Sequence, residues 1–157
     1  MTEDKKTQEK RVMEILGKAK ALAKEYHLLT GRPLGVTGEV AEYEAARILG
    51  IELASVRQSG YDAIRVDNLK KTRLQIKGRR VLDPSKPGQR VGRIDLSKEW
   101  DVALLVLVND DFDAYEIIEA SRSNIEEALK APGSKARNER GALSVSKFKS
   151  IGKRIWP

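Results

Sequence analysis

The sequence of 157 residues contains no cysteine and only one histidine, His27. The lack of cysteine excludes disulfide bonds, zinc–thiolate sites and cysteine nucleophiles, and it is compatible with a reducing compartment. One histidine cannot supply a histidine-based metal cage. Because His27 follows a predicted helix, we expect it to interact with the helix dipole or to lie on the surface, rather than to act in catalysis.

Long apolar runs are also missing. The longest one, residues 102–108, is far too short to cross a bilayer, and residues 1–10 are too polar for a signal peptide. We therefore expect a cytoplasmic protein. A glycine-rich phosphate loop, a dinucleotide fingerprint and a nucleophile elbow are absent as well. The groups that remain available for catalysis are carboxylates and lysines. These groups are typical of sites where magnesium assists the attack of water on a phosphodiester.

Acidic residues are scarce in two regions of a basic chain. Thirty lysine and arginine residues against 23 aspartate and glutamate residues give a net charge of +7. Residues 70–93 contain nine basic residues and one acid, and residues 130–154 contain eight and one, whereas residues 95–127 are acidic. Segregated basic blocks favour a polyanionic partner, most often nucleic acid, over an ordinary basic surface.

Hydrophobic spacing predicts one α/β domain at residues 36–157, preceded by an N-terminal helix and connection at residues 1–35. The N-terminal helix, expected at residues 7–26, is predicted to pack on the domain or on a second copy. Strand 102–108 shows no alternation, so we expect it to be buried on both faces at the centre of the sheet. Further helices are expected at 37–49 and 124–131, and further strands at 51–56, 61–66, 72–81, 94–96 and 114–118.

The main candidate site combines one aspartate with two polar residues of the next strand. If residues 61–66 and 72–81 form a hairpin, Asp62 lies near Gln75 and Lys77, which share a strand face because they are two residues apart. A carboxylate, an amide oxygen and an ammonium group would then converge. Such a place suits a hard cation and an activated water.

A further acid lies on the preceding predicted helix. Glu39 occupies the first turn of the helix at residues 37–49. There a carboxylate stabilises the helix by roughly 0.3–1 kcal/mol through the helix dipole. Alternatively, Glu39 is a third acidic group directed at Asp62, and this stretch of sequence leaves both interpretations open.

These residues occur in an order that resembles the PD-(D/E)XK nuclease superfamily, which includes restriction endonucleases and Holliday-junction resolvases. A helix with Glu39 precedes Gly60-Tyr61-Asp62, and Gln75-Ile76-Lys77 follows on the next strand, before a buried strand and a helix. The resemblance covers residues 36–127. It implies a restriction endonuclease-like α/β core, with a mixed sheet flanked by helices in αβββαβ order.

The resemblance also implies roles for individual residues. Asp62 would be the metal ligand, Gln75 an auxiliary ligand through its side-chain oxygen, Lys77 the catalytic lysine and Glu39 the helix-borne carboxylate near the metal. Gln75 stands where the family usually has an acid, and it resembles the variant of the methylation-directed restriction branch. It removes one negative charge from the metal site. The implied cofactor is Mg²⁺ or Mn²⁺.

The function implied by the resemblance is that of a metal-dependent DNA endonuclease that hydrolyses phosphodiester bonds. DNA is the expected partner, and a homodimer would agree with the many nucleases that dimerise to cut both strands. Arg79 and Arg80 have the alternative of pairing with acids on neighbouring elements. The side chains expected to contact backbone phosphates are those of Lys70, Lys71, Arg79, Arg80, Lys86, Arg90 and Arg93.

Two rival functions stay open. Gln75 motivates the first, a catalytically inactive nucleic-acid-binding module on the same fold. The second is a structural or interaction protein in which Asp62 and Lys77 form an ion pair, and in which the acidic block at residues 95–127 faces the basic block of another chain.

Overall fold

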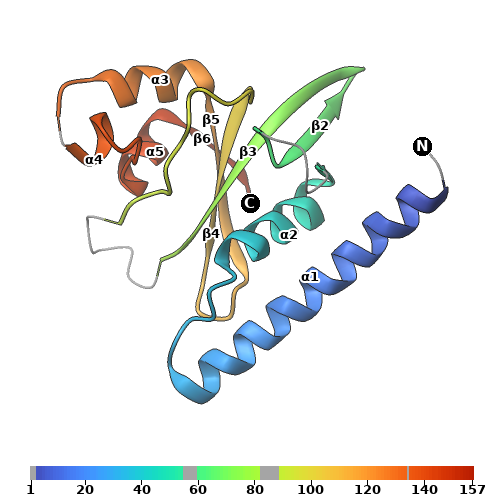
Figure 1. Cartoon of the computed structure of the whole chain (residues 1–157). Coiled ribbons are helices and arrows are strands. Elements are labelled where there is room, and N and C mark those ends of the chain that lie inside the picture. The colour runs from blue at the N-terminus through green and yellow to red at the C-terminus, as the bar shows by residue number, and fades with distance from the viewer. Residues whose placement is uncertain (1–2, 55–59, 82–88, 134) are drawn as a thin grey trace.

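A six-stranded mixed β-sheet with helices on both faces forms the body of the molecule (Figure 1). The computed structural model describes residues 3–54, 60–81, 89–133 and 135–157. The protein is thus of the α/β class, as its sequence predicts. The strands are β1 (Glu52–Leu53), β2 (Ala63–Asp67), β3 (Lys70–Arg80), β4 (Val102–Val108), β5 (Ala114–Ser121) and β6 (Lys153–Trp156). The helices are α1 (Glu3–Thr30), α2 (Thr37–Leu49), α3 (Arg122–Lys130), α4 (Lys135–Asn138) and α5 (Val145–Ile151).

The strands follow one another across the sheet in chain order. Neighbouring strands are antiparallel except for β3 and β4, which run parallel, so the chain crosses the length of the sheet between them. In the β2–β3 hairpin, Ala63 pairs with Leu74 and Asp67 pairs with Lys70. The predicted hairpin is therefore confirmed. None of the helices in the described ranges combines the length and apolar character needed to cross a membrane.

One face of the sheet is covered by α2, whose small residues allow a close approach. Ala41 and Ala45 are fully buried in a cluster with Leu74 and Ile76 of β3. A Cβ atom at Gly78 would lie only 2.5 Å from the Cβ atom of Ala41, so the helix and the strand meet at a position where only glycine fits. This contact sets the distance between α2 and the sheet.

The opposite face is covered by α3, by α5 and by residues 89–101. Ile125 of α3 and Phe148 of α5 are fully buried there. Alternate side chains of β4 enter the two different clusters, which explains why this strand is apolar throughout and confirms its predicted burial on both faces. Ala103, Leu105 and Leu107 face α3 and α5, and Leu104, Val106 and Val108 face α2.

The N-terminal helix α1 is longer than the predicted 7–26 and packs against α2 (Figure 1). The Nζ atom of Lys20 lies 2.6 Å from Oε1 of the fully buried Glu44 and 2.7 Å from Oδ1 of Asp113. His27 lies inside the helix rather than after its end, and its Nε2 atom accepts a hydrogen bond of 2.7 Å from Nη2 of Arg80. These polar contacts fasten α1 to the domain.

The segment that crosses from β3 to β4 is irregular in its described residues 89–101. The strand predicted at 94–96 is wrong, because Val91 N–H and Ile94 N–H donate to the carbonyls of Leu143 (2.8 Å) and Gly141 (3.0 Å), away from the sheet. No helix occurs in these residues either, although the expected αβββαβ order places one between the third and fourth strands. The crossover segment is therefore fixed by loop contacts.

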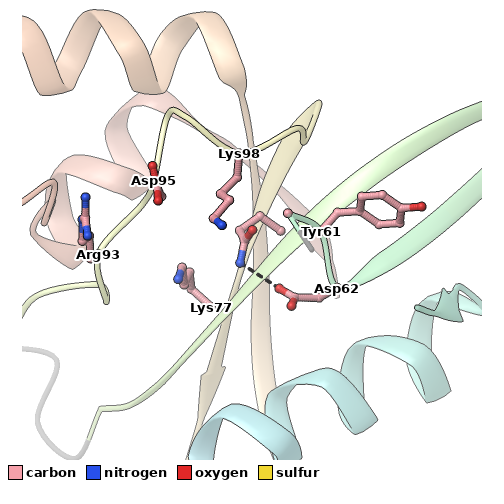
Figure 2. A pocket seen from close by; sticks show the side chains of 8 residues that line it. Tyr61, Asp62, Lys77, Arg93, Asp95 and Lys98 are labelled. Atoms are coloured by element: carbon pink, nitrogen blue, oxygen red, sulfur yellow. Dashed lines mark hydrogen bonds between the residues drawn. The ribbon is translucent and has the colours of Figure 1, made fainter. Parts of the chain in front are cut away.

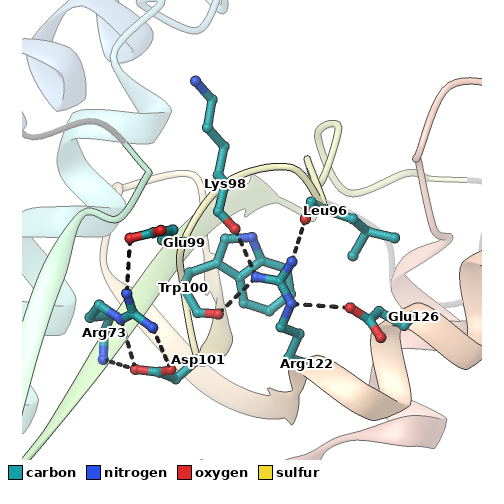
Figure 3. Close-up of polar contacts among 8 residues, drawn as sticks. All are labelled: Arg73, Leu96, Lys98, Glu99, Trp100, Asp101, Arg122 and Glu126. Carbon is teal, nitrogen blue, oxygen red and sulfur yellow. Dashed lines mark hydrogen bonds and ion pairs between the residues drawn. The ribbon is translucent and has the colours of Figure 1, made fainter.

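An arginine holds the end of this segment in place (Figure 3). Nη1 of Arg122 donates to the carbonyl oxygens of Lys98 (2.7 Å) and Trp100 (3.0 Å), and Nη2 donates to the carbonyl of Leu96. The guanidinium group also stacks on the indole of Trp100, 4.7 Å from its centroid. Since Trp100 itself is buried, residues 96–100 are anchored to the core although they have no regular structure.

Candidate active site

Asp62 lies at the point where the β2–β3 ladder ends. Its backbone N–H donates to the carbonyl of Leu74 at 2.8 Å, which is a normal ladder bond. Its carboxylate then takes the place of a backbone partner, since Oδ2 accepts from the N–H of Ile76 at 2.7 Å. The side chain of Asp62 is therefore held by the neighbouring strand at a fixed position beside β3.

Gln75 and Lys77 stand on the same face of β3, as the period of two predicts. Nε2 of Gln75 donates to Oδ2 of Asp62 at 2.9 Å. Asp62, Gln75 and Lys77 line one open cavity of about 210 Å³ (Figure 2). The structure thus brings together the three residues of the predicted constellation. Within the described residues, no ion pair joins Asp62 to Lys77, which is the contact that a purely structural role would require.

Burial opposes the charges of both Asp62 and Lys77. It raises the pKa of the Asp62 carboxyl, while the hydrogen bond from Ile76 and the charge of Lys77 act in the opposite direction. Burial likewise lowers the pKa of the Lys77 ammonium group, against the attraction of Asp62 and Asp95. An acid and a base with displaced pKa values in one cavity are typical of a functional site.

The helix acid that responds to the charge of Asp62 is Glu42, one turn beyond the predicted Glu39. Burial, together with the negative charges of Asp62 and Glu39, raises the pKa of Glu42 to about 7. Glu39 is exposed, and it influences the site through Glu42. The two residues lie three positions apart on the same side of α2, so the sequence already grouped them. The rotation of the helix against the sheet decides which of them is buried.

The crossover segment supplies the other wall of the cavity. Arg93, Asp95 and Lys98 line it opposite Lys77, whereas the ring of Tyr61 points away (Figure 2). Asp95 accepts hydrogen bonds from the Ser97 hydroxyl (2.6 Å) and backbone N–H (2.9 Å), which lower the pKa of its carboxyl. Sequence patterns did not single out Asp95 or Lys98, because their position depends on contacts of a loop.

Asp62 and Gln75 line the cavity with side-chain oxygens that a cation could use, and Glu42 adds a carboxylate close enough for the charge of Asp62 to raise its pKa. Among the described residues, no group of three or more histidine, aspartate and glutamate side chains is placed to hold a metal ion. Two carboxylates with raised pKa values and one amide oxygen nevertheless suit Mg²⁺, which takes few protein ligands and keeps several waters. Ligation through Gln75 requires its amide to turn, since its nitrogen now faces Asp62.

The basic side chains assigned to phosphate contacts differ in their surroundings. Arg80 is only 10% exposed, pairs with Asp110 at 3.0 Å and lies over the ring of Phe112. It thus has the acidic partner that was the alternative to a phosphate contact. Nε of Arg79 donates to the carbonyl of Arg90, and Nη1 of Arg90 donates to the carbonyl of Ala142 at 2.8 Å.

The other assigned residues face solvent where the structure describes them. Lys70 and Lys71 are exposed at the start of β3, next to the hairpin turn, and Arg93 is exposed at the edge of the cavity. Lys86 lies outside the described residues. Among the residues assigned to phosphate contacts, Lys70 and Lys71 at the tip of the hairpin and Arg93 beside the cavity are therefore best placed to meet a polyanion.

Comparison with known proteins adds no assignment. No protein-family model matches the chain, and no curated protein matches it either. The geometry and electrostatics of the cavity around Asp62 are therefore the features that bear on function.

Proposed function

We propose that this chain is a metal-dependent DNA endonuclease-like protein that hydrolyses phosphodiester bonds on a restriction endonuclease-like core. The observation that carries the proposal is the convergence of Asp62, Gln75 and Lys77 in one open, polar cavity at the end of the β2–β3 ladder. Glu42 on α2 and the basic residues along the rim support it. The described part of the crossover between β3 and β4, residues 89–101, is irregular and departs from the order implied by the resemblance.

Each side chain has a role that follows from its chemistry. Asp62, Glu42 and the oxygen of Gln75 would hold Mg²⁺ or Mn²⁺, and the ion, when bound, would supply Lewis-acid activation of the phosphate and of a water. Lys77 would orient the attacking water and stabilise the negative charge that develops on the phosphate. Arg93 and Lys98 would bind the flanking phosphates. The water oxygen would form a bond to phosphorus while the bond from phosphorus to the leaving oxygen breaks, the water giving its proton to solvent and the leaving oxygen taking one from solvent.

A nicking assay on supercoiled plasmid tests the proposal. With Mg²⁺ or Mn²⁺ we expect cleavage by the wild-type chain, and none with EDTA. Lys77→Ala should lower the cleavage rate by about 10²–10³-fold, because it removes a charge-stabilising donor, with little change in DNA affinity. Lys10→Ala is the matched control, since it removes the same charge from an exposed position on α1. Cleavage by Lys77→Ala at the wild-type rate would show that the site assignment is wrong.

The second candidate is a nucleic-acid-binding module that has lost catalysis. The hydrogen bond from Gln75 to Asp62 favours it, because this bond partly satisfies the carboxylate without a cation. Robust DNA binding with no nicking under either metal would support this function over the first. Gln75→Glu then shows whether the missing acid is the cause, since it should restore nicking if the remaining site is intact.

A further inference from the structure

Helix α1 has a second apolar face whose large side chains are exposed, although Ala19 is half-buried and Val12 also lines a groove beside Met13. Its inner face meets the domain through Met13, Lys20 and Ala23. The other apolar face is open to solvent, with Tyr26 38% exposed and Leu29 78% exposed. Its members are Val12, Ile15, Ala19, Leu22, Tyr26 and Leu29.

The spacing of this outer stripe is regular. Its six residues are alternately three and four positions apart, which is the a/d pattern of a coiled-coil seam. Ile15, Leu22, Tyr26 and Leu29 lie on a different side of the helix from Met13 and Lys20, so the packing of α1 on α2 does not explain why they are apolar. In Figure 1, α1 lies along the outside of α2 at the edge of the molecule. Extended apolar surface of this kind marks an interaction site.

We propose that this stripe pairs with the same stripe of a second copy of the chain, with the two α1 helices antiparallel. Charge complementarity identifies the occupant and the direction. Lys18 and Glu25 flank the stripe on one side, both are exposed, and among the described residues neither has an ion-pair partner. In an antiparallel pair, Lys18 of each helix faces Glu25 of the other.

The apolar layers match the same register. When Ala19 of one helix lies opposite Leu22 of the other, Ile15 lies opposite Tyr26, and Val12 lies opposite Leu29. All six stripe residues are then covered, and the interface has the twofold symmetry that is usual for homodimers. A parallel pair would instead place Lys18 and Glu25 beside uncharged residues, Ala23 and Thr30.

The dimer is independent of the proposed nuclease function, and sedimentation equilibrium of the full chain tests it directly. We expect the wild-type chain to dimerise. Leu22→Glu should weaken the association by about tenfold or more, because it puts a carboxylate into the seam from both copies. The monomer should keep its helicity and melting temperature, since Leu22 is 60% exposed. The control is Leu28→Glu, because Leu28 is 71% exposed but lies off the stripe.

A charge swap tests the direction of the helices. Lys18→Glu alone should weaken the dimer a few-fold. At both symmetry-related places in the dimer, the new carboxylate would face Glu25 of the other copy. The double variant Lys18→Glu/Glu25→Lys should recover the wild-type dissociation constant. A wild-type chain that stays monomeric, a Leu22→Glu variant that dimerises normally, or an equal effect of Leu28→Glu would overturn the interface. A double variant without recovery would overturn the antiparallel pairing.

Discussion

At the residue scale, Glu42 is the group of the site whose charge is least favoured. Its carboxylate is partly buried and is repelled by Asp62 and Glu39, which together raise the pKa of Glu42 to about 7. A cation between Asp62 and Glu42 would offset both the burial and the repulsion. The same electrostatic arrangement destabilises the metal-free chain and, on the proposed function, would favour binding of a divalent ion.

Replacement of Glu42 by glutamine should stabilise the metal-free protein at high pH. Below the ordinary pKa of 4.5, native and unfolded chains both hold the proton, so Glu42 adds no cost there. Between this value and the native pKa of about 7, stability falls as the pH rises, because only the unfolded chain gives up the proton. Allowing for partial exposure, Glu42→Gln should raise the free energy of unfolding by about 1–2 kcal/mol at alkaline pH.

Urea unfolding of both proteins with EDTA, at a series of pH values, measures this effect. The gain should disappear below the ordinary pKa of glutamate. Glu39→Gln is the control, because this neighbouring carboxylate is exposed and should show a much smaller gain. An equal gain for Glu42→Gln at every pH would contradict the assigned role of its ionisation.

At the element scale, the contact between Gly78 and α2 decides where Glu42 lies. Gly78→Ala would place a Cβ atom 2.5 Å from Cβ of Ala41 and 3.0 Å from the carbonyl oxygen of Thr37. Because backbone must move to relieve such a contact, we expect a loss of about 1–3 kcal/mol in stability. The helix should also shift away from Asp62, so the alkaline gain of Glu42→Gln should shrink in the Gly78→Ala background.

Gly38→Ala serves as the control for this glycine. Gly38 lies in α2 itself, and a Cβ atom there has nothing within 4 Å. Alanine favours the helix over glycine, so this variant should be more stable by roughly 0.5–1 kcal/mol. Chemical denaturation of the two variants gives both values. If Gly78→Ala were as stable as the wild type, the close contact would not set the position of α2.

The elements that sequence patterns predicted correctly are those defined by local periodicity. The hairpin and the helix at 37–49 carry the repeat of their element, and the run at 102–108 is short and apolar throughout, as a strand buried on both faces should be. The pairing of Gln75 and Lys77 on one face follows from the same rule. The site was therefore predictable wherever it depends on the period of a strand.

The remainder depends on contacts between distant segments. Residues 94–96 have the apolar alternation of a short strand, but the N–H of Ile94 donates to the carbonyl of Gly141 instead of the sheet. Asp95 and Lys98 reach the cavity because Arg122 holds their loop from another element. Arg80 lies on the opposite face of β3 from Gln75, where it meets His27, which no local pattern reveals.

At the scale of the whole molecule, the charge of +7 is partly neutralised within the fold. Arg65, Arg73 and Arg80 pair with acids, so their charge is less available to a partner. Lys70 and Lys71 are exposed beside the hairpin turn, where β2 and β3 project from the body (Figure 1). Binding to a polyanion should therefore depend more on the hairpin tip than on the total charge.

Removal of the two hairpin lysines should reduce the salt dependence of DNA binding. Each phosphate contact that is lost lowers the slope of log affinity against log salt by about one, so Lys70→Ser/Lys71→Ser should lower it by about two. Lys6→Ser/Lys10→Ser removes the same charge from exposed positions on α1 and should leave the slope nearly unchanged. Fluorescence anisotropy with labelled duplex over a salt series measures both slopes. Equal changes in the two variants would mean that the partner responds to net charge alone, and would remove the hairpin from the binding surface.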